Sequence, residues 1–382
     1  MSVLLPWTRK RGREGPGIRA GRPVPASNRP KASLLSMLFT LLGIVALLLT
    51  AREALFEGTL ARMLPEGSKV WEASSLEHSG GLYAVAYENG RAFYGPLGKI
   101  VSLPDGTEEA VISGGKAYAI AGTSIHGYGP DGKLFLTQVK EPGENLLPCK
   151  GLSGILVVRP GGGGFGEPWV LRAVFDGGEV SPPVRLPGIP AEAAAEDGLL
   201  YVGLRDIASG GAALLTCAEV SSGKVLWCLP LGDGHFRSII PLSSGRVFYA
   251  TSKSAGVVGP GGGITCSLNL GGPVWTAAWE DETAFISHGL ISEPFVTAFA
   301  EDGKLVWQRR TPSVAHRLVA SDHALVALCQ THVVGFSLRD GRREYSFKTR
   351  DLPLAVGEGS ILFGNDKGAY LMSLDINLSR LP

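Results

Sequence analysis

The five cysteines are the residues of this sequence whose spacing could most directly support chemistry, either as metal ligands or as disulfides. They are Cys149, Cys217, Cys228, Cys266 and Cys329. No Cys-x-x-Cys pair occurs, so the spacing predicts no metal site. Cys217 and Cys228 flank a turn at Ser221–Lys224. A two-residue loop would place their thiols opposite each other, where a disulfide could form, whereas a three-residue loop with a bulge would place them on opposite faces. The remaining alternative is that all five are small buried hydrophobic residues.

The seven histidines are scattered, and no pair has ligand spacing on one element, so each is expected on the surface or in a loop. They are His78, His126, His235, His288, His316, His323 and His332. The segment Gly127–Leu134 imitates a phosphate-binding loop, but Leu134 stands where the magnesium-binding Ser or Thr would be, and a strand is expected to follow. The glycine runs at 161–164 and 261–263 are expected in turns. The sequence therefore predicts no catalytic, cofactor-binding or metal-binding residue.

The charge of the chain is concentrated at its N-terminus. Residues 1–31 contain eight basic residues against a single acid, Glu14, a net charge of +7 that leaves about −6 for the remainder of a chain whose net charge is +1. Pro16, Pro23, Pro25 and Pro30 lie among glycines in this segment, so we expect a disordered tail. A basic tail next to an apolar segment indicates membrane topology and contact with anionic lipid before it indicates nucleic-acid binding.

An uncharged apolar segment follows this tail at residues 32–51. Twenty helical residues span roughly 30 Å, the thickness of the hydrocarbon core. The positive charges on its N-terminal side predict a single-pass signal anchor in the plasma membrane, with a cytoplasmic N-terminus and an extracytoplasmic C-terminal part. A buried soluble helix and a cleaved signal peptide are the alternatives. Residues 52–69, whose first part has apolar side chains at helical spacing, are expected to form a juxtamembrane stalk.

A repeat extends over most of residues 70–382. Its strongest copies are Ser222–Trp227, Asp302–Trp307 and Asp340–Tyr345, each with a turn glycine followed four residues later by an aromatic residue. The corresponding glycines are Gly98, Gly132, Gly177, Gly223, Gly262, Gly303 and Gly341. A period of about 40 residues is typical of a propeller blade with four strands.

The repeat unit predicts an all-β fold, because an Asp-Gly or Ser-Gly turn joins short strands rich in β-branched and aromatic residues. We expect a single β-propeller of four-stranded blades, eight in number, with seven as the alternative. Residues 82–103 would build the first blade, and the last strands near 370–380 would close the ring. The aromatic residue after each turn, such as Trp227 or Trp307, is expected to pack between neighbouring blades.

The copies around Trp227 and Trp307 resemble the β-propeller repeat of quinoprotein dehydrogenases and their cofactor-free relatives, among them the periplasmic propeller lipoprotein of the outer-membrane assembly machine. For a dehydrogenase, this resemblance implies a quinone stacked on a tryptophan, a calcium ion held by acidic and amide side chains, and often a disulfide between adjacent cysteines. No two cysteines of this sequence are adjacent. The cofactor-free branch is therefore the closer resemblance, and no cofactor is expected.

Taken together, these features predict a membrane-anchored, non-catalytic scaffold that binds an envelope or secreted protein partner through one flat end of the propeller. A quinone-dependent enzyme and a sensor ectodomain are the alternatives. An enzyme predicts a deep axial pocket with converging carboxylates or a metal, whereas a scaffold predicts a shallow, mixed face with exposed aromatic or apolar residues.

Overall fold

The computed structural model describes residues 60–61, 69–75, 82–87, 91–95, 98–161, 167–206, 211–320, 324–357, 360–365 and 368–373. All of them belong to one compact unit, Glu57–Pro382, and none to the other, Met1–Phe56. The predicted tail at 1–31 and the predicted anchor at 32–51 thus lie outside the described residues. Within the described part of the chain, no helix has the length and apolar character needed to cross a membrane.

The described strands form eight antiparallel sheets of four strands each, which we number 1 to 8 in chain order. Sheet 1 contains β2 (Lys69–Ser75), β3 (Leu82–Tyr87), β4 (Ala92–Gly95) and β5 (Gly98–Ser102). Sheet 2 contains β6 (Thr107–Ser113), β7 (Lys116–Ala121), β8 (Ser124–Tyr128) and β9 (Leu134–Val139). Sheet 3 contains β10 (Asn145–Leu147), β11 (Gly154–Arg159), β12 (Trp169–Phe175) and β13 (Val184–Leu186).

Sheet 4 contains β14 (Ile189–Glu196), β15 (Leu199–Arg205), β16 (Ala212–Glu219) and β17 (Lys224–Asp233). Sheet 5 contains β18 (Phe236–Leu242), β19 (Arg246–Thr251), β20 (Ala255–Val258) and β21 (Ile264–Leu268), with a short 3₁₀ turn at Ser243–Gly245. Sheet 6 contains β22 (Val274–Glu280), β23 (Thr283–Leu290), β24 (Glu293–Ala300) and β25 (Leu305–Arg310). Sheet 7 contains β26 (Ala315–Ala320), β27 (Ala324–Cys329), β28 (His332–Ser337) and β29 (Arg343–Lys348). Sheet 8 contains β30 (Leu352–Gly357), β31 (Ser360–Asn365), β32 (Gly368–Ser373) and β1 (Leu60–Ala61).

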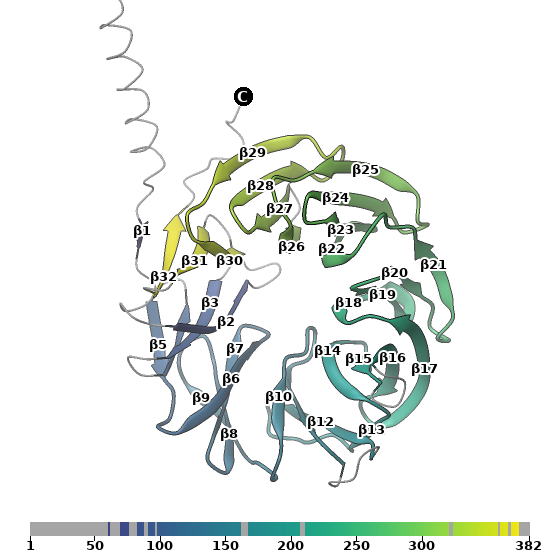
Figure 1. Cartoon of the computed structure of the whole chain (residues 1–382). Helices are drawn as coiled ribbons and strands as arrows, with labels where there is room; N and C mark the ends of the chain where they lie inside the picture. Colours follow the sequence, from purple (N-terminus) through teal and green to yellow (C-terminus); the bar gives the residue numbers. More distant parts are fainter. Residues whose placement is uncertain are drawn as a thin grey trace, which may run out of the picture. The chain divides into compact units, whose positions relative to one another are not determined.

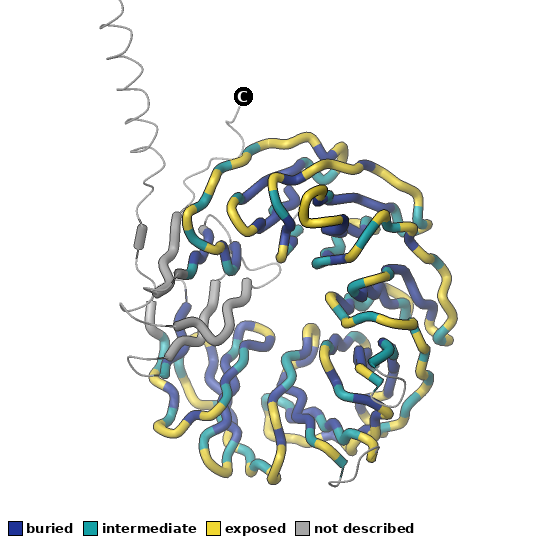
Figure 2. Tube along the Cα trace, in the orientation of Figure 1, coloured by how far each residue is buried: buried dark blue, intermediate teal, exposed yellow. Residues whose placement is uncertain are grey.

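Consecutive sheets pack face to face and close a ring (Figure 1). Leu171 of sheet 3 shares a buried cluster with Leu204 of sheet 4, and Phe248 of sheet 5 shares one with Ile286 of sheet 6. β30 contacts both β27 and β2, so the eighth sheet joins the seventh to the first. Figure 2 shows the consequence, with buried residues inside the sheets and exposed ones along the outermost strands and the turns. This confirms the predicted all-β propeller with eight blades, and the alternative of seven is wrong.

The ring is closed by a strand from the N-terminal side of the repeat. β1 pairs with β32, with Leu60 opposite Met372 and Ala61 opposite Leu371, and supplies the fourth strand of sheet 8. This strand lies within residues 52–69, which we expected to be a stalk with helical spacing. Sheet 1 likewise begins at Lys69, before the expected start at residue 82. The propeller thus reaches beyond residue 70 toward the N-terminus, because a last sheet of three strands needs a partner for its outer edge.

The aromatic residues after the repeat turns join neighbouring blades, as predicted. Trp307 of sheet 6 packs between Phe285 of its own sheet and Phe336 of sheet 7, and its Nε1 donates a 2.8 Å hydrogen bond to the carbonyl of Leu338. A Cβ on Gly341 would lie 2.5 Å from the Trp307 ring, so only glycine fits there. Trp227 makes the corresponding contacts with sheet 5, donating to the carbonyl of Pro260 at 2.9 Å.

The ring has two faces, which we name by the connections they carry. The linker face holds the segments that join each sheet to the next, together with the turns between the second and third strands of each sheet. The hairpin face holds the other two sets of turns, including the repeat turns with positive φ at Gly223, Gly303 and Gly341. In sheet 3 the positive φ belongs to Gly178 and not to Gly177, the glycine that the repeat pattern assigned.

Candidate functional site

The five cysteines are free thiols. Cys217 is paired with Trp227, and Cys228 with Thr216, because a bulge between Cys217 and Ala218 shifts the register by one residue. The out-of-register alternative is therefore confirmed, and the alternative of a disulfide between Cys217 and Cys228 is wrong. Burial raises the pKa of Cys217 to about 11 and that of Cys329 to about 12, which keeps both thiols protonated and unreactive.

The histidines do not form a site in the described part of the chain. His235 lies in the linker between β17 and β18, as predicted, with its backbone N–H donating to Ser252 Oγ at 3.1 Å. His288 is a correction, because it is buried in β23 and its Nε2 lies 2.7 Å from Thr297 Oγ1. A pattern of apolar neighbours, Ile286 and Phe295, was the signal that could have placed it inside. At Gly127–Leu134, β9 begins at Leu134, so a strand follows the glycines as predicted.

The described side chains offer no acidic cluster for the calcium ion that the resemblance to dehydrogenases implies. Among them, no three His, Cys, Asp or Glu residues gather where they could hold a metal ion. Two half-buried carboxylates on described inner strands have a raised pKa, and they stand on different sheets. Glu109 of β6 accepts a 3.1 Å hydrogen bond from the backbone N–H of Leu146, and burial raises its pKa. Burial also raises the pKa of Glu192 in β14, and the positive charge of Lys150 partly offsets this rise.

The feature that stands out on the linker face is the β23–β24 turn of sheet 6. Leu290 pairs with Glu293, so Ile291 and Ser292 form a tight two-residue connection. Leu290 is 60% exposed and Ile291 is 73% exposed. A shallow depression of about 310 Å³ lies beside the turn. Its lining residues are Ile291, Ser292, Pro294, Arg310, Thr311, Pro312 and Arg343.

Exposed apolar residues elsewhere mostly follow from the repeat. Leu134, Ile264 and Leu305 are exposed at the first residue of the outermost strand of their sheets, two residues after the glycine of the repeat turn. The apolar β23–β24 turn has no counterpart among the equivalent connections that the structure describes in full. The corresponding described connections are Gly122-Thr123 in sheet 2, Ser252–Ser254 in sheet 5 and Gln330-Thr331 in sheet 7, all without a large apolar side chain. Val139 and Leu352 are also exposed toward the linker face, each as a single residue.

The β23–β24 turn is held rigidly from beneath. The indole of Trp275 donates a 2.9 Å hydrogen bond to the carbonyl of Gly289, and the Gly289 N–H donates to the carbonyl of Pro273 at 2.9 Å. The backbone N–H of Thr311 donates to the carbonyl of Pro294 at 3.1 Å. These bonds fix the turn on both sides, so its apolar tip is presented without a large loss of conformational entropy when something binds it.

Two arginines line the depression and bond only to backbone carbonyls. Arg310, the last residue of β25, donates from Nη2 to the carbonyl of Ser292 at 3.0 Å. Arg343, the first residue of β29, donates from Nη2 to the carbonyl of Arg310 at 3.4 Å. Arg343 follows the repeat turn at Gly341, so the depression extends from the linker end of β25 to the hairpin end of β29. Among the described residues, no carboxylate forms an ion pair with either guanidinium. The depression therefore carries uncompensated positive charge.

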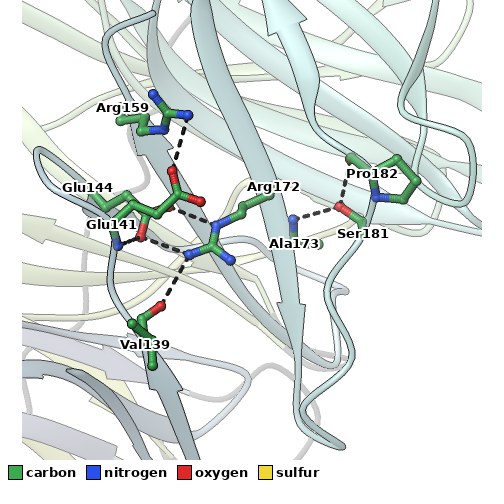
Figure 3. Close-up of polar contacts among 8 residues, drawn as sticks. All are labelled: Val139, Glu141, Glu144, Arg159, Arg172, Ala173, Ser181 and Pro182. Carbon is green, nitrogen blue, oxygen red and sulfur yellow. Dashed lines mark hydrogen bonds and ion pairs between the residues drawn. The ribbon is translucent and has the colours of Figure 1, made fainter. Parts of the chain in front are cut away.

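Arginines of sheet 3 on the same face are neutralised, which makes the contrast informative (Figure 3). Arg172 binds Glu144 with both guanidinium contacts, Nε–Oε1 at 2.7 Å and Nη2–Oε2 at 2.8 Å, and this bond raises the pKa of Arg172. Arg159 pairs with Glu141 at 3.1 Å. These ion pairs hold the linker before β10 in place, so a structural role accounts for both arginines. Arg310 and Arg343 have no such partner in the part of the chain that the structure describes.

No protein-family model matches the sequence, and the search of curated proteins finds no match. The fold is similar to solved structures. BamB from Moraxella catarrhalis has a TM-score of 0.50 at 12% identity, with 83% of this chain and 93% of BamB covered. Sqt1 from Saccharomyces cerevisiae has a TM-score of 0.56 at 12% identity, with coverage of 80% and 95%.

The quinohemoprotein alcohol dehydrogenase ADHIIG from Pseudomonas putida HK5 has a TM-score of 0.54 at 9% identity, with 82% of this chain and 71% of the enzyme covered. At such identities the likeness concerns the fold alone, so neither a catalytic nor a binding role is transferred from these proteins. The chain has the β-propeller fold, and in that fold it is similar to the quinoprotein-like propellers whose repeat its sequence resembles.

Proposed function

We propose that this chain is a non-catalytic scaffold of the cell envelope that binds a protein partner on the linker face of its propeller. One observation carries the proposal: the turn at Leu290–Glu293, which the Trp275 indole holds in place, exposes two large apolar side chains beside a depression with two arginines. Protein interfaces have this composition, with an apolar centre and arginine among the enriched residue types. A solvated surface has no physical need for it.

A membrane tether is the second part of the proposal. The uncharged segment at 32–51 and the basic residues before it support an anchor with a cytoplasmic N-terminus, which would hold the propeller outside the membrane. A membrane-impermeant maleimide applied to spheroplasts tests this orientation. Cys228, which is exposed, should react, whereas a Ser27→Cys variant should gain no additional label. Labelling of the introduced cysteine without lysis would contradict the orientation.

In-cell photo-crosslinking tests the binding face. A photoreactive amino acid replaces Ile291 in the full-length protein, and Leu305 serves as the matched control. Leu305 is 60% exposed in the same sheet, at the opposite end of β25 from Arg310, so it differs from Ile291 chiefly in its face. We expect a discrete protein adduct from position 291 and none from position 305. Equal adducts at both positions, or no adduct at 291, would count against a partner on the linker face.

A further inference from the structure

We propose that the partner enters the depression between sheets 6 and 7 with an acidic segment, in which an Asp or Glu carboxylate binds Arg310 and Arg343 and an adjoining apolar residue packs on Ile291. This inference rests on the proposed function and adds the chemistry of the partner. It concerns the same turn and the arginines that line the depression next to it.

The charge of the depression selects an anion. Its lining contains two guanidinium groups and no acidic residue. Glu293 and Glu344 are close in sequence, but no ion pair joins either of them to Arg310 or Arg343 in the described structure. Each guanidinium uses one Nη2 on a carbonyl, so further N–H groups remain for an acceptor. The planar guanidinium and carboxylate groups match in geometry and form charge-assisted hydrogen bonds.

A buried hydroxyl in the lining indicates the same kind of ligand. Thr311 is 3% exposed, and its Oγ1 has no hydrogen-bond partner among the described residues. An unsatisfied buried hydroxyl costs about 1–3 kcal/mol. A carboxylate of the bound segment that came within reach would accept a hydrogen bond from this hydroxyl.

The size and the surroundings of the depression favour a polypeptide segment. A volume of about 310 Å³ is at the lower limit of small-molecule pockets, which occupy roughly 300–1,000 Å³, so it has room for a side chain or two. Leu290 and Ile291 extend the contact beyond it as an apolar shelf. An anionic membrane surface is bound by clusters of about 4–8 Lys and Arg residues, whereas the lining of this depression contains two arginines.

The test combines the crosslink at position 291 with charge reversal in the full-length protein. The crosslinked partner peptide is sequenced, and the yield is compared between the parent and the double variant Arg310→Glu/Arg343→Glu. Lys348→Glu is the matched control, because Lys348 is exposed on β29 and does not line the depression. Arg310→Lys/Arg343→Lys keeps the charge and removes the forked geometry. Circular dichroism and melting temperature confirm that each variant folds, and any variant that does not is replaced by its single mutants.

We expect an Asp or Glu within two residues of the crosslinked position and at least a tenfold loss of yield in the double Glu variant. The double Lys variant should be intermediate, and Lys348→Glu unchanged. Poly-glutamate should compete and poly-lysine should not. A neutral or basic crosslinked segment, with yield unchanged by the double Glu variant, would overturn the acidic partner while leaving the scaffold intact. Loss of all protein adducts, with binding of the protein to phosphatidylglycerol vesicles through these arginines, would overturn both in favour of a lipid surface.

Discussion

Replacing Trp307 by Ala removes a side chain that joins sheets 6 and 7. The indole is 4% exposed, and its ring centroid lies 5.8 Å from that of Phe285 and 5.9 Å from that of Phe336. Its Nε1 donates to the Leu338 carbonyl at 2.8 Å. Its ring covers the turn at Gly341, where a glycine alone fits beneath it. The substitution therefore opens a cavity at a blade junction and leaves a carbonyl without its donor.

The size of the effect can be worked from these contacts. A buried Trp→Ala change costs about 3–5 kcal/mol. Two aromatic pairs, each contributing about 0.5–1.5 kcal/mol beyond area, and the unpaired carbonyl place this site in the upper part of that range, about 4–5 kcal/mol. An unfolding entropy of about 2.1 cal/mol/K per residue, applied to the unit Glu57–Pro382, converts this to a fall in Tm on the order of 7 °C.

Thermal unfolding of the full-length protein in detergent, followed by circular dichroism in the β region, measures this change. Trp307→Phe keeps a ring and loses the N–H, so about half of the effect is expected. Lys304→Ala is the control on the same hairpin, because its side chain is 83% exposed, and a change within about 0.5 kcal/mol is expected. If Trp307→Ala lowered Tm no more than Lys304→Ala, the reasoning that this residue joins the blades would be refuted.

Three further outcomes are expected. In denaturant unfolding, Gly341→Ala should destabilise the protein much more than Gly106→Ala. Both glycines have positive φ, but only at Gly341 does the Trp307 ring occupy the space that a Cβ would need. Equal effects of the two substitutions would contradict this packing. Iodoacetamide applied to the folded protein should modify the exposed Cys228 and leave the buried Cys217 unmodified. A reducing agent should leave the Tm of the protein unchanged. A fall in Tm on reduction would reveal a disulfide. Burial lowers the pKa of His288, so as pH falls the unfolded chain binds a proton at this residue before the folded chain does. The free energy of unfolding should therefore fall as pH drops below about 6.5. His288→Gln should make this fall less steep in pH-dependent unfolding, and an unchanged steepness would exclude this histidine as its source.

The repeat made the ring predictable from sequence because each blade is specified locally. An Asp-Gly turn followed by an aromatic residue determines a hairpin and its contact with the next blade, as the pairing of Trp307 with Gly341 shows. The closure of the ring by the strand Leu60–Ala61 could not be predicted from a local sequence pattern. Two residues give no pattern, and their strand exists only because β32 offers an unpaired edge far along the chain.

The candidate site was only partly predictable. The sequence indicated a flat end of the propeller as the place of binding, but Leu290 and Ile291 read as the continuation of a strand. Their exposure depends on the register that pairs Leu290 with Glu293, which a single sequence does not reveal. The two turn residues, Ile291 and Ser292, are not the Gly, Asn or Asp that usually mark a two-residue hairpin turn, so the sequence did not indicate a turn here. Arg343 joins the site from the next sheet, and that contact is purely tertiary.

The affinity of the purified protein for the partner identified by crosslinking tests the central claim most directly. Isothermal titration calorimetry would compare Ile291→Asp with Leu305→Asp, two exposed apolar residues of one sheet on opposite faces. We expect the Kd to rise at least tenfold for Ile291→Asp and to stay unchanged for Leu305→Asp, with both variants folded. An unchanged Kd for Ile291→Asp would contradict binding at the linker face.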